Sequence, residues 1–263
     1  MTLQFGDILK EWRGIRRISQ LDLSLEADTS SRHVSFLESG RSRPSRGMIL
    51  KLAEALQMPR AAVNNALLAA GYAPVFPDLP QDHEALAPVH AAINTMLQSH
   101  MPYPGVVVDR HWDLINANMA AMQMFAAAGL TGVNNMVEML IVDDPENSII
   151  VNWPELASLT LARLKTENLH CGGNPRLQKM IADLAGHSRF EGEDLSAVDL
   201  YAPVIPMVLR IGDMQLTLFS TIAQFGTVQD ITLSDFSIEL IFPVDDATRR
   251  WFESQAENAD TPS

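Results

Sequence analysis

The stretch SQLDLSLEADTSSRHVSFLE, residues 19–38, decides the fold of the first part of the chain. It predicts two short helices joined by a tight turn. Ser19 and Ser30 can each cap a helix by accepting a hydrogen bond from a backbone N–H two or three residues on. Four apolar side chains recur at helical spacing and are expected to face a common core. They are Leu21, Leu25, Val34 and Leu37.

The second of these helices begins with side chains suited to reading DNA. Ser31, Arg32 and Ser35 stand at i, i+1 and i+4, on the outer face of the helix. A helix that enters the major groove presents its base-contacting residues near its start, and an arginine can bind guanine bidentately. We therefore expect double-stranded DNA to be a partner.

Three further helices complete an all-α, five-helix domain over residues 1–72. The first is expected over 3–16, the fourth begins near Ser45, and the fifth runs from Pro59 to Gly71. Gly40 follows the third helix, where glycine takes the left-handed conformation without steric cost. The side chains expected to point inward are Phe5, Ile8, Leu9, Trp12, Ile49, Leu52, Ala53, Leu56, Val63, Leu67 and Leu68.

Charge is distributed unevenly along the chain. Residues 1–72 carry ten Lys and Arg against seven Asp and Glu, a balance of +3, so a net charge of −13 leaves −16 for the remainder. Phosphate repels such an acidic remainder, which favours DNA contact through the N-terminal domain alone; the acidity can equally serve solubility. Cys171 is the only cysteine, as expected in a reducing cytoplasm. No apolar run approaches the roughly 20 residues that cross a bilayer.

Residues 73–80 contain three prolines and predict an extended connection to a second domain over 81–250. Helices are expected over 84–100 and 118–128, and two more are expected to start at Pro154 and Pro175, each of which lies just inside the first turn. Strands are expected over 105–109, 112–116, 203–211, 214–222 and 236–242. Alternation such as Phe236, Ile238, Leu240 and Phe242 predicts half-buried antiparallel strands. The order predicts an α+β domain with a five-stranded antiparallel sheet. Residues 251–263 are expected to form a polar, disordered tail.

No constellation of an enzyme is found in the sequence. The seven histidines show no paired metal spacing, and there is neither a phosphate-binding glycine loop nor a Gly-x-Ser-x-Gly motif. We therefore expect no catalytic residue, no metal and no cofactor. Thirteen methionines fit either a filled core or a malleable apolar pocket. Residues that could wall such a pocket or orient a polar head group also have a structural interpretation: Trp112, Asn116, Asn118, Asn152, Trp153 and Thr221.

The first domain resembles the Xre/Cro-type helix-turn-helix of phage and bacterial repressors. The resemblance rests on Ser19-Gln20, on SFLESG at 35–40 and on Pro44-Ser45. It implies that Gln20 touches a phosphate or a base edge and that Glu38 pairs with an arginine of the first helix, for which we nominate Arg13. By the same resemblance the base-facing positions are Ser31, Arg32 and Ser35, with His33 as a flanking or packing residue, and the contacts to the DNA backbone are Arg41, Arg43 and Arg46. The sequence departs from the pattern at Asp28, where glycine is usual in the turn, and at Ser24, where alanine is common.

The whole chain resembles the MmyB-like regulators, in which an Xre-type reader precedes a PAS-like ligand-binding domain. The motifs are RHVSFLESGR at 32–41, LLAAGYAP at 67–74, VDRHWD at 108–113, VNWPEL at 151–156, and FGT at 225–227 leading to DITL at 230–233. The resemblance implies a cytoplasmic, homodimeric transcription regulator that binds a small apolar effector, such as a fatty-acid-like molecule with an acyl chain. Two alternatives stay open: an enzyme or protein-interaction scaffold with a vestigial reader, and a regulator whose second domain only dimerises.

Overall fold

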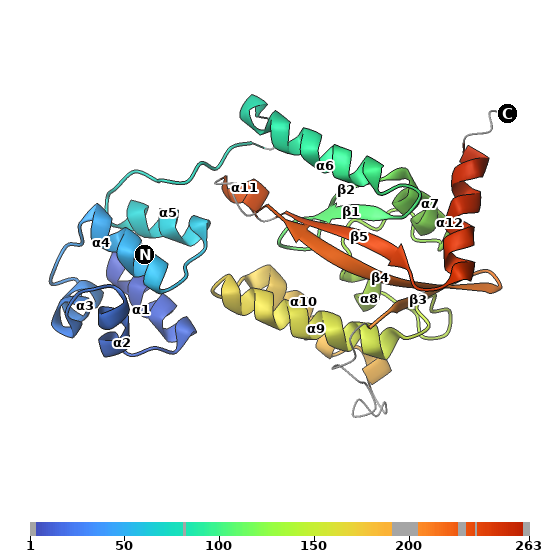
Figure 1. Ribbon diagram of the computed structural model, residues 1–263. Helices are drawn as coiled ribbons and strands as arrows, with labels where there is room; N and C mark the ends of the chain where they lie inside the picture. The colour runs from blue at the N-terminus through green and yellow to red at the C-terminus, as the bar shows by residue number, and fades with distance from the viewer. Residues whose placement is uncertain (1–3, 81–82, 191–204, 226–229, 235, 260–263) are drawn as a thin grey trace. The chain divides into compact units, whose positions relative to one another are not determined.

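The computed structural model describes residues 4–80, 83–190, 205–225, 230–234 and 236–259. The chain divides into two compact units, and Figure 1 shows the helices and strands of each. The first unit is all-α and the second is α+β, as the sequence predicts. The helices of the first unit are α1 (Phe5–Arg16), α2 (Gln20–Glu26), α3 (Ser31–Glu38), α4 (Arg46–Ala55) and α5 (Arg60–Ala69).

Serine caps begin three of these helices. The hydroxyl oxygens of Ser19, Ser30 and Ser45 accept from the backbone N–H three residues on, at 3.1, 3.1 and 3.2 Å. Each cap satisfies a backbone donor that would otherwise lack a helical partner. The turn between α2 and α3 passes through Asp28, whose φ of 47° lies in the left-handed region that aspartate tolerates better than most residues. The capping predictions are thus confirmed for Ser19 and Ser30.

The core of the first unit confirms most of the expected inward residues, but three leucines were placed wrongly. Leu21, Leu25 and Leu68 are 58%, 72% and 56% exposed, whereas Leu23 is fully buried. Leu21 and Leu25 in α2 are four residues apart, and so are Leu23 and the C-cap residue Ala27, so helical spacing allows either face to turn inward. Packing selects the second face, on which Ser24 and Ala27 are small enough for neighbouring helices to approach closely.

The boundary of the first domain lies beyond residue 72. The side-chain oxygen of Asn64 accepts from the backbone N–H of Val75 and of Phe76 at 3.0 and 3.1 Å, and its amide donates to the Phe76 carbonyl at 2.8 Å. Val75 and Phe76 also pack against the core of the first unit. The first half of the proline-rich connection therefore belongs to this unit, because its backbone polar groups are satisfied there.

The second unit is built on one antiparallel sheet with the strand order β2-β1-β5-β4-β3. The strands are β1 (Gly105–Val108), β2 (Leu114–Ala117), β3 (Met207–Ile211), β4 (Met214–Gln224) and β5 (Ser237–Pro243). The helical elements that follow α5 along the chain are η1 (Glu84–Leu86), α6 (Ala87–Ser99), α7 (Met119–Ala127), α8 (Glu138–Ile141), α9 (Trp153–His170), α10 (Pro175–Ala185), η2 (Ser188–Phe190), α11 (Ile231–Ser234) and α12 (Asp246–Ala259). The five-stranded antiparallel sheet is confirmed; of the predicted strand 203–211, residues 203 and 204 lie outside the described residues, as do 226 and 227 of the FGT motif.

Helices cover both faces of the sheet (Figure 1). A Cβ added to Gly105 would lie 2.9 Å from a Leu97 methyl group of α6, so glycine is needed for this helix to approach β1 closely. On β5, Ile238 and Glu239 point to opposite faces and are only 1% and 7% exposed. The prediction of a half-buried β5 is therefore wrong, because helices lie over the face that alternation had assigned to solvent.

The predicted disordered tail is largely helical. The helix α12 continues to Ala259, and Phe252 on it is 1% exposed and belongs to the core of the second unit. The ring of Phe252 meets those of Tyr103 and Trp251 edge-on, at centroid distances of 6.2 and 4.8 Å. The polar composition of 251–263 misled the prediction because this helix buries only one narrow apolar stripe. Residues 260–263 lie outside the described residues.

Candidate functional sites

The start of α3 forms an exposed polar surface on the first unit. Ser31 and Arg32 are exposed, and His33 and Ser35 are half-buried. The guanidinium of Arg32 lies over the Phe36 ring, 5.2 Å from its centroid. The expected base-facing residues therefore share one surface, and their roles toward DNA stay a prediction.

An ion pair holds α3 in place from behind. Arg13 Nε on α1 donates to Glu38 Oε1 at 2.7 Å, and Arg13 Nη2 donates to Glu38 Oε2 at 3.1 Å. A third partner, Gln20 Nε2 on α2, donates to Glu38 Oε2 at 2.7 Å. The nominated pairing of Arg13 with Glu38 is present, and the Gln20 amide is engaged in supporting it; its expected contact with a phosphate or a base edge stays a prediction.

The charge state of this pair follows from its partners. Burial pushes the pKa of Glu38 upward, but the hydrogen bonds from Arg13 and Gln20 and the nearby positive charge outweigh it, so the pKa lies below its ordinary value. The hydrogen bond to Glu38 raises the pKa of Arg13 above its ordinary value. Gly6 contributes by its size, because a Cβ there would lie 2.6 Å from the carbonyl oxygen of Glu38. The first turn of α1 and the end of α3 are thus fixed against each other.

Further cations follow α3. Arg41, Arg43 and Arg46 are all exposed, and the guanidinium of Arg41 lies 5.9 Å from the centroid of the Phe36 ring. Phosphate contacts from such side chains position a protein on DNA without reading its sequence. The loop and the start of α3 together give the first unit an exposed cationic surface, and phosphate contact by these three arginines stays a prediction.

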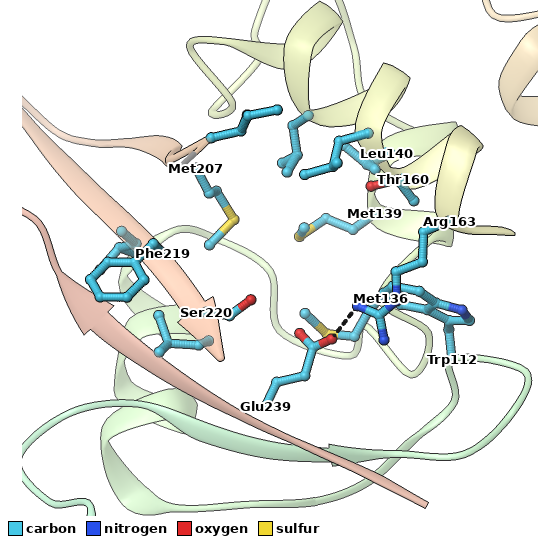
Figure 2. A pocket seen from close by; sticks show the side chains of 15 residues that line it. Trp112, Met136, Met139, Leu140, Thr160, Arg163, Met207, Phe219, Ser220 and Glu239 are labelled. Atoms are coloured by element: carbon cyan, nitrogen blue, oxygen red, sulfur yellow. Dashed lines mark hydrogen bonds and ion pairs between the residues drawn. The ribbon is translucent and has the colours of Figure 1, made fainter. Parts of the chain in front are cut away.

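The second unit contains an apolar cavity of about 130 Å³. Figure 2 shows the side chains that surround it, which come from the β1–β2 turn, α8, α9 and the sheet. Methionine is prominent among them, as one of the two interpretations of the methionine-rich sequence predicts. The lining residues are Trp112, Met136, Met139, Leu140, Leu156, Leu159, Thr160, Arg163, Ile205, Met207, Leu218, Phe219, Ser220, Glu239 and Ile241.

An ion pair crosses one wall of this cavity. Arg163 Nη1 on α9 donates to Glu239 Oε1 on β5 at 2.7 Å, and the two side chains are 26% and 10% exposed (Figure 2). The guanidinium also lies 4.0 Å from the centroid of the Trp112 ring. This is a close cation–π contact, and such contacts strengthen where water is excluded. Trp112, Arg163 and Glu239 form one connected polar group in a cavity that is otherwise mainly apolar.

Trp112 reaches the cavity from a strained backbone. Its φ is 64°, which is uncommon for a bulky residue. The neighbouring Asp109 holds the turn, since its Oδ1 accepts from the backbone N–H of His111 and Asp113 at 2.7 and 3.0 Å. Such strain persists only where the surroundings enforce it, and it is frequent at ligand clamps. The conformation of this turn therefore directs the indole ring of Trp112 into the cavity.

The same turn brings Asp109, His111 and Asp113 together, with potential ligand atoms within 4.8 Å of one another. Both carboxylates already have partners: Asp109 holds the turn, and Asp113 receives two hydrogen bonds from Arg176, each 2.6 Å long. Burial pushes the pKa of Asp113 upward, but the hydrogen bonds from Arg176 and Asn135 and the nearby positive charge lower it by more. The pKa therefore lies below its ordinary value. The cluster is accounted for as the brace of the turn.

Of the six residues expected to contact a ligand, Trp112 alone lines this cavity. Asn116 donates to Asn94, Asn118 caps α7, and Asn152 bridges Pro206 and Val208. Trp153 is fully buried and donates to the Leu140 carbonyl at 3.0 Å, while Thr221 is exposed. The three asparagines and Trp153 thus have structural roles, which was the alternative interpretation.

Sequence reasoning missed the polar residues that do line the cavity: Thr160, Arg163, Ser220 and Glu239. One signal was present, because Glu239 is the one charged residue of the strand predicted over 236–242. Thr221 was chosen where Ser220 lines the cavity, an error of one residue, which in a strand places the side chain on the opposite face.

Two family models match the chain. Residues 89–254 match the model described as MmyB-like transcription regulator ligand binding domain, and residues 9–62 match the model described as Helix-turn-helix. The first match covers more than half of the chain and contains the cavity-lining residues; the second contains α2, α3 and the arginines that follow. No match was found among the curated proteins. Within the described ranges, each helix is too short or too polar to cross a bilayer.

Proposed function

The chain belongs to the MmyB-like transcription regulators and is a DNA-binding regulator with a ligand-binding domain. We propose that it reads a specific DNA sequence as a homodimer and responds to a small apolar effector. The observation that carries the proposal is that one chain contains both an exposed polar and cationic surface on its first unit and an apolar cavity in its second unit. One is the exposed start of α3, fixed by the Arg13–Glu38 pair; the other is the apolar cavity under Trp112.

Sequence-specific reading is assigned to Ser31, Arg32 and Ser35. Arg32 is exposed and has the length and the donor geometry to bind guanine bidentately. The arginines at 41, 43 and 46 would meet phosphates and set the register on the duplex. The balance of +3 over residues 1–72 supports contact through this unit rather than through the acidic remainder.

A homodimer is proposed because one small reader makes too few contacts for selective binding, whereas two readers can share a two-fold site. The second unit offers an apolar surface for a second copy, since Met119 and Met122 on α7 are 59% and 54% exposed. They are three residues apart and share one face of the helix. Met122→Glu is expected to shift the mass measured by light scattering toward the monomer, whereas Gln123→Glu serves as the control.

The effector is proposed to be a molecule with an acyl-like chain held in the cavity. Methionine and leucine supply seven of the fifteen lining residues, and methionine adapts to irregular apolar shapes. The cavity volume of about 130 Å³ is below the roughly 300–1,000 Å³ of sites for drug-sized ligands, so a short chain fits without rearrangement. The PAS-like description of the domain is part of this proposal, supported by the strand order and by the helices between β2 and β3.

Effector and DNA would be linked by a shift in population. A ligand changes the response only if it binds one arrangement of the dimer better than another, and the same difference in affinity then changes the affinity for DNA. The sensor would thereby set the spacing of the two readers.

The test is selection of DNA from a random pool by the full chain, followed by footprinting on the enriched sequence and on the DNA upstream of its own gene. We expect enrichment of one two-fold symmetric sequence, weaker binding as salt rises, and loss of specific binding in Arg32→Ala. Failure to enrich any sequence would contradict the proposal. Native mass spectrometry of the freshly purified protein separates a sensor from a domain that only dimerises, because a retained small molecule adds its mass.

A further inference from the structure

Two residues supply all the charge among the described residues that line the cavity, and they neutralise each other. Glu239 stands on the central strand β5 and Arg163 on α9, with 2.7 Å between Oε1 and Nη1. The remaining lining residues are apolar, apart from the hydroxyl-bearing Thr160 and Ser220 and the indole of Trp112. The cavity therefore presents hydrogen-bonding groups without an excess of either charge.

This arrangement penalises a charged ligand of either sign. A ligand carboxylate that approached Arg163 would have to share it with the carboxylate of Glu239, and two like charges at such close range destabilise each other. A ligand ammonium group that approached Glu239 would meet the guanidinium of Arg163 in the same way. An uncharged hydroxyl, amide or ester group carries neither penalty and can still exchange hydrogen bonds with a charged acceptor.

We infer that Glu239 determines specificity and makes the cavity select an apolar chain that ends in an uncharged polar group over the carboxylate of the same length. The inference rests on the proposed function, in that the cavity is taken to hold an acyl-like chain, and it adds the chemistry of the head group. Glu239 acts by occupying Arg163, the cation that a fatty-acid carboxylate would otherwise use. Thr160 on α9, which is 9% exposed, and Ser220 on β4 contribute hydroxyl groups to the lining of the same cavity (Figure 2).

The experiment measures binding of 1-octanol, octanoate and octylamine to the full chain by isothermal titration calorimetry at pH 7.5. For the wild type we expect octanol to bind at least 10-fold more tightly than octanoate and octylamine. In Glu239→Gln, which keeps the size of the side chain, octanoate should gain at least 10-fold while octanol changes less than 3-fold. In Arg163→Gln, octylamine should gain instead. Glu253→Gln on the exposed face of α12 is the control variant and should leave all three affinities unchanged.

The outcomes separate this inference from the proposed function. Tighter binding of octanoate than octanol by the wild type overturns the role of Glu239 and leaves the apolar cavity in place as the ligand site. An octanoate affinity that Glu239→Gln does not raise overturns it too, once circular dichroism shows the variant to be folded. If none of the three compounds binds the wild type, both this inference and the proposed acyl-like effector are refuted. The wild-type comparison alone decides the matter should either variant fail to fold.

Discussion

Two arginine–glutamate pairs of equal length stand in the two units of this protein. Arg13 and Glu38 in the first unit, and Arg163 and Glu239 in the second, are each joined at 2.7 Å, with glutamates that are 6% and 10% exposed. The first pair is surrounded by further protein partners, since Gln20 donates to Glu38. The second pair borders a cavity. The same chemical contact therefore holds two helices together where protein surrounds it and lines a cavity where space is left beside it.

The largest expected loss of stability comes from breaking the Arg13–Glu38 ion pair of the first unit. Glu38→Gln replaces one acceptor oxygen by an amide that would point its own N–H groups at the donors of Arg13 or Gln20. Loss of one partner of a buried pair costs roughly 3 kcal/mol, since the other charge is left without compensation. Hydrogen exchange measured by mass spectrometry should show faster exchange in peptides covering α1 and α3.

The matched substitution in the second unit is Glu239→Gln, and it sharpens the comparison. Arg163 is 26% exposed and lies on the Trp112 ring, so it keeps a favourable environment when the glutamate charge is removed. We expect a change of about 1 kcal/mol or less in the unfolding free energy of the second unit. A loss as large as that of Glu38→Gln would show that both pairs are braces.

A substitution at the exposed start of α3 should weaken DNA binding without any loss of stability. Arg32→Ala is expected to weaken binding to the selected DNA sequence by about 1–3 kcal/mol, the value of one bidentate contact to a base. Since Arg32 is exposed, the unfolding free energy should change by less than about 0.5 kcal/mol. Gel-shift titration and urea denaturation measure the two quantities. Arg46→Ala is the comparison variant and should weaken binding to all sequences alike.

Acid should remove part of the stabilisation that the Arg13–Glu38 ion pair contributes. The pKa of Glu38 is lowered in the folded protein, so its contribution to stability is fully present above the ordinary glutamate pKa of about 4.3. As pH falls through that value and then through the lower folded value, the contribution is lost. The difference in unfolding free energy between wild type and Glu38→Gln should therefore be constant near neutral pH and shrink in acid. A difference that grows as pH falls would contradict the assignment.

The smallest effect is expected at the exposed face of α2. Leu25→Ala should change the unfolding free energy by less than about 0.5 kcal/mol, whereas Leu23→Ala should cost roughly 2–5 kcal/mol because Leu23 is completely buried. Thermal unfolding followed by circular dichroism compares them. Equal losses in the two variants would restore the face that helical spacing alone suggested.

Local signals in the sequence were sufficient for much of the first unit. Ser19 and Ser30 were recognisable as caps because a cap depends on residues within three positions. The Arg13–Glu38 pair came from the resemblance to helix-turn-helix proteins rather than from spacing. The exposure of Leu25 could not be predicted, since helical periodicity defines faces without stating which of them packs.

The cavity could not be predicted from local sequence signals. Its wall is assembled from Trp112, from Arg163 fifty-one residues later and from Glu239 near the end of the second unit. Composition left a methionine-filled core and a methionine-rich pocket as alternatives, and Trp112 was one of several candidates for the wall of such a pocket. The asparagines chosen as head-group contacts instead satisfy backbone groups, as Asn118 does for Gly105 and Ala121. Such a role depends on buried donors that become neighbours only after folding.

The sequence by itself determined the two-part plan of this protein, the exposed residues at the start of α3 and the antiparallel sheet, because caps, turns and periodic patterns act over a few residues. The tertiary structure alone decided which face of α2 is buried, that residues 251–259 belong to a helix on the core, and that Glu239 meets Arg163 beside a cavity. These features depend on which distant surfaces exclude water from each other, and that is settled only when the whole chain packs.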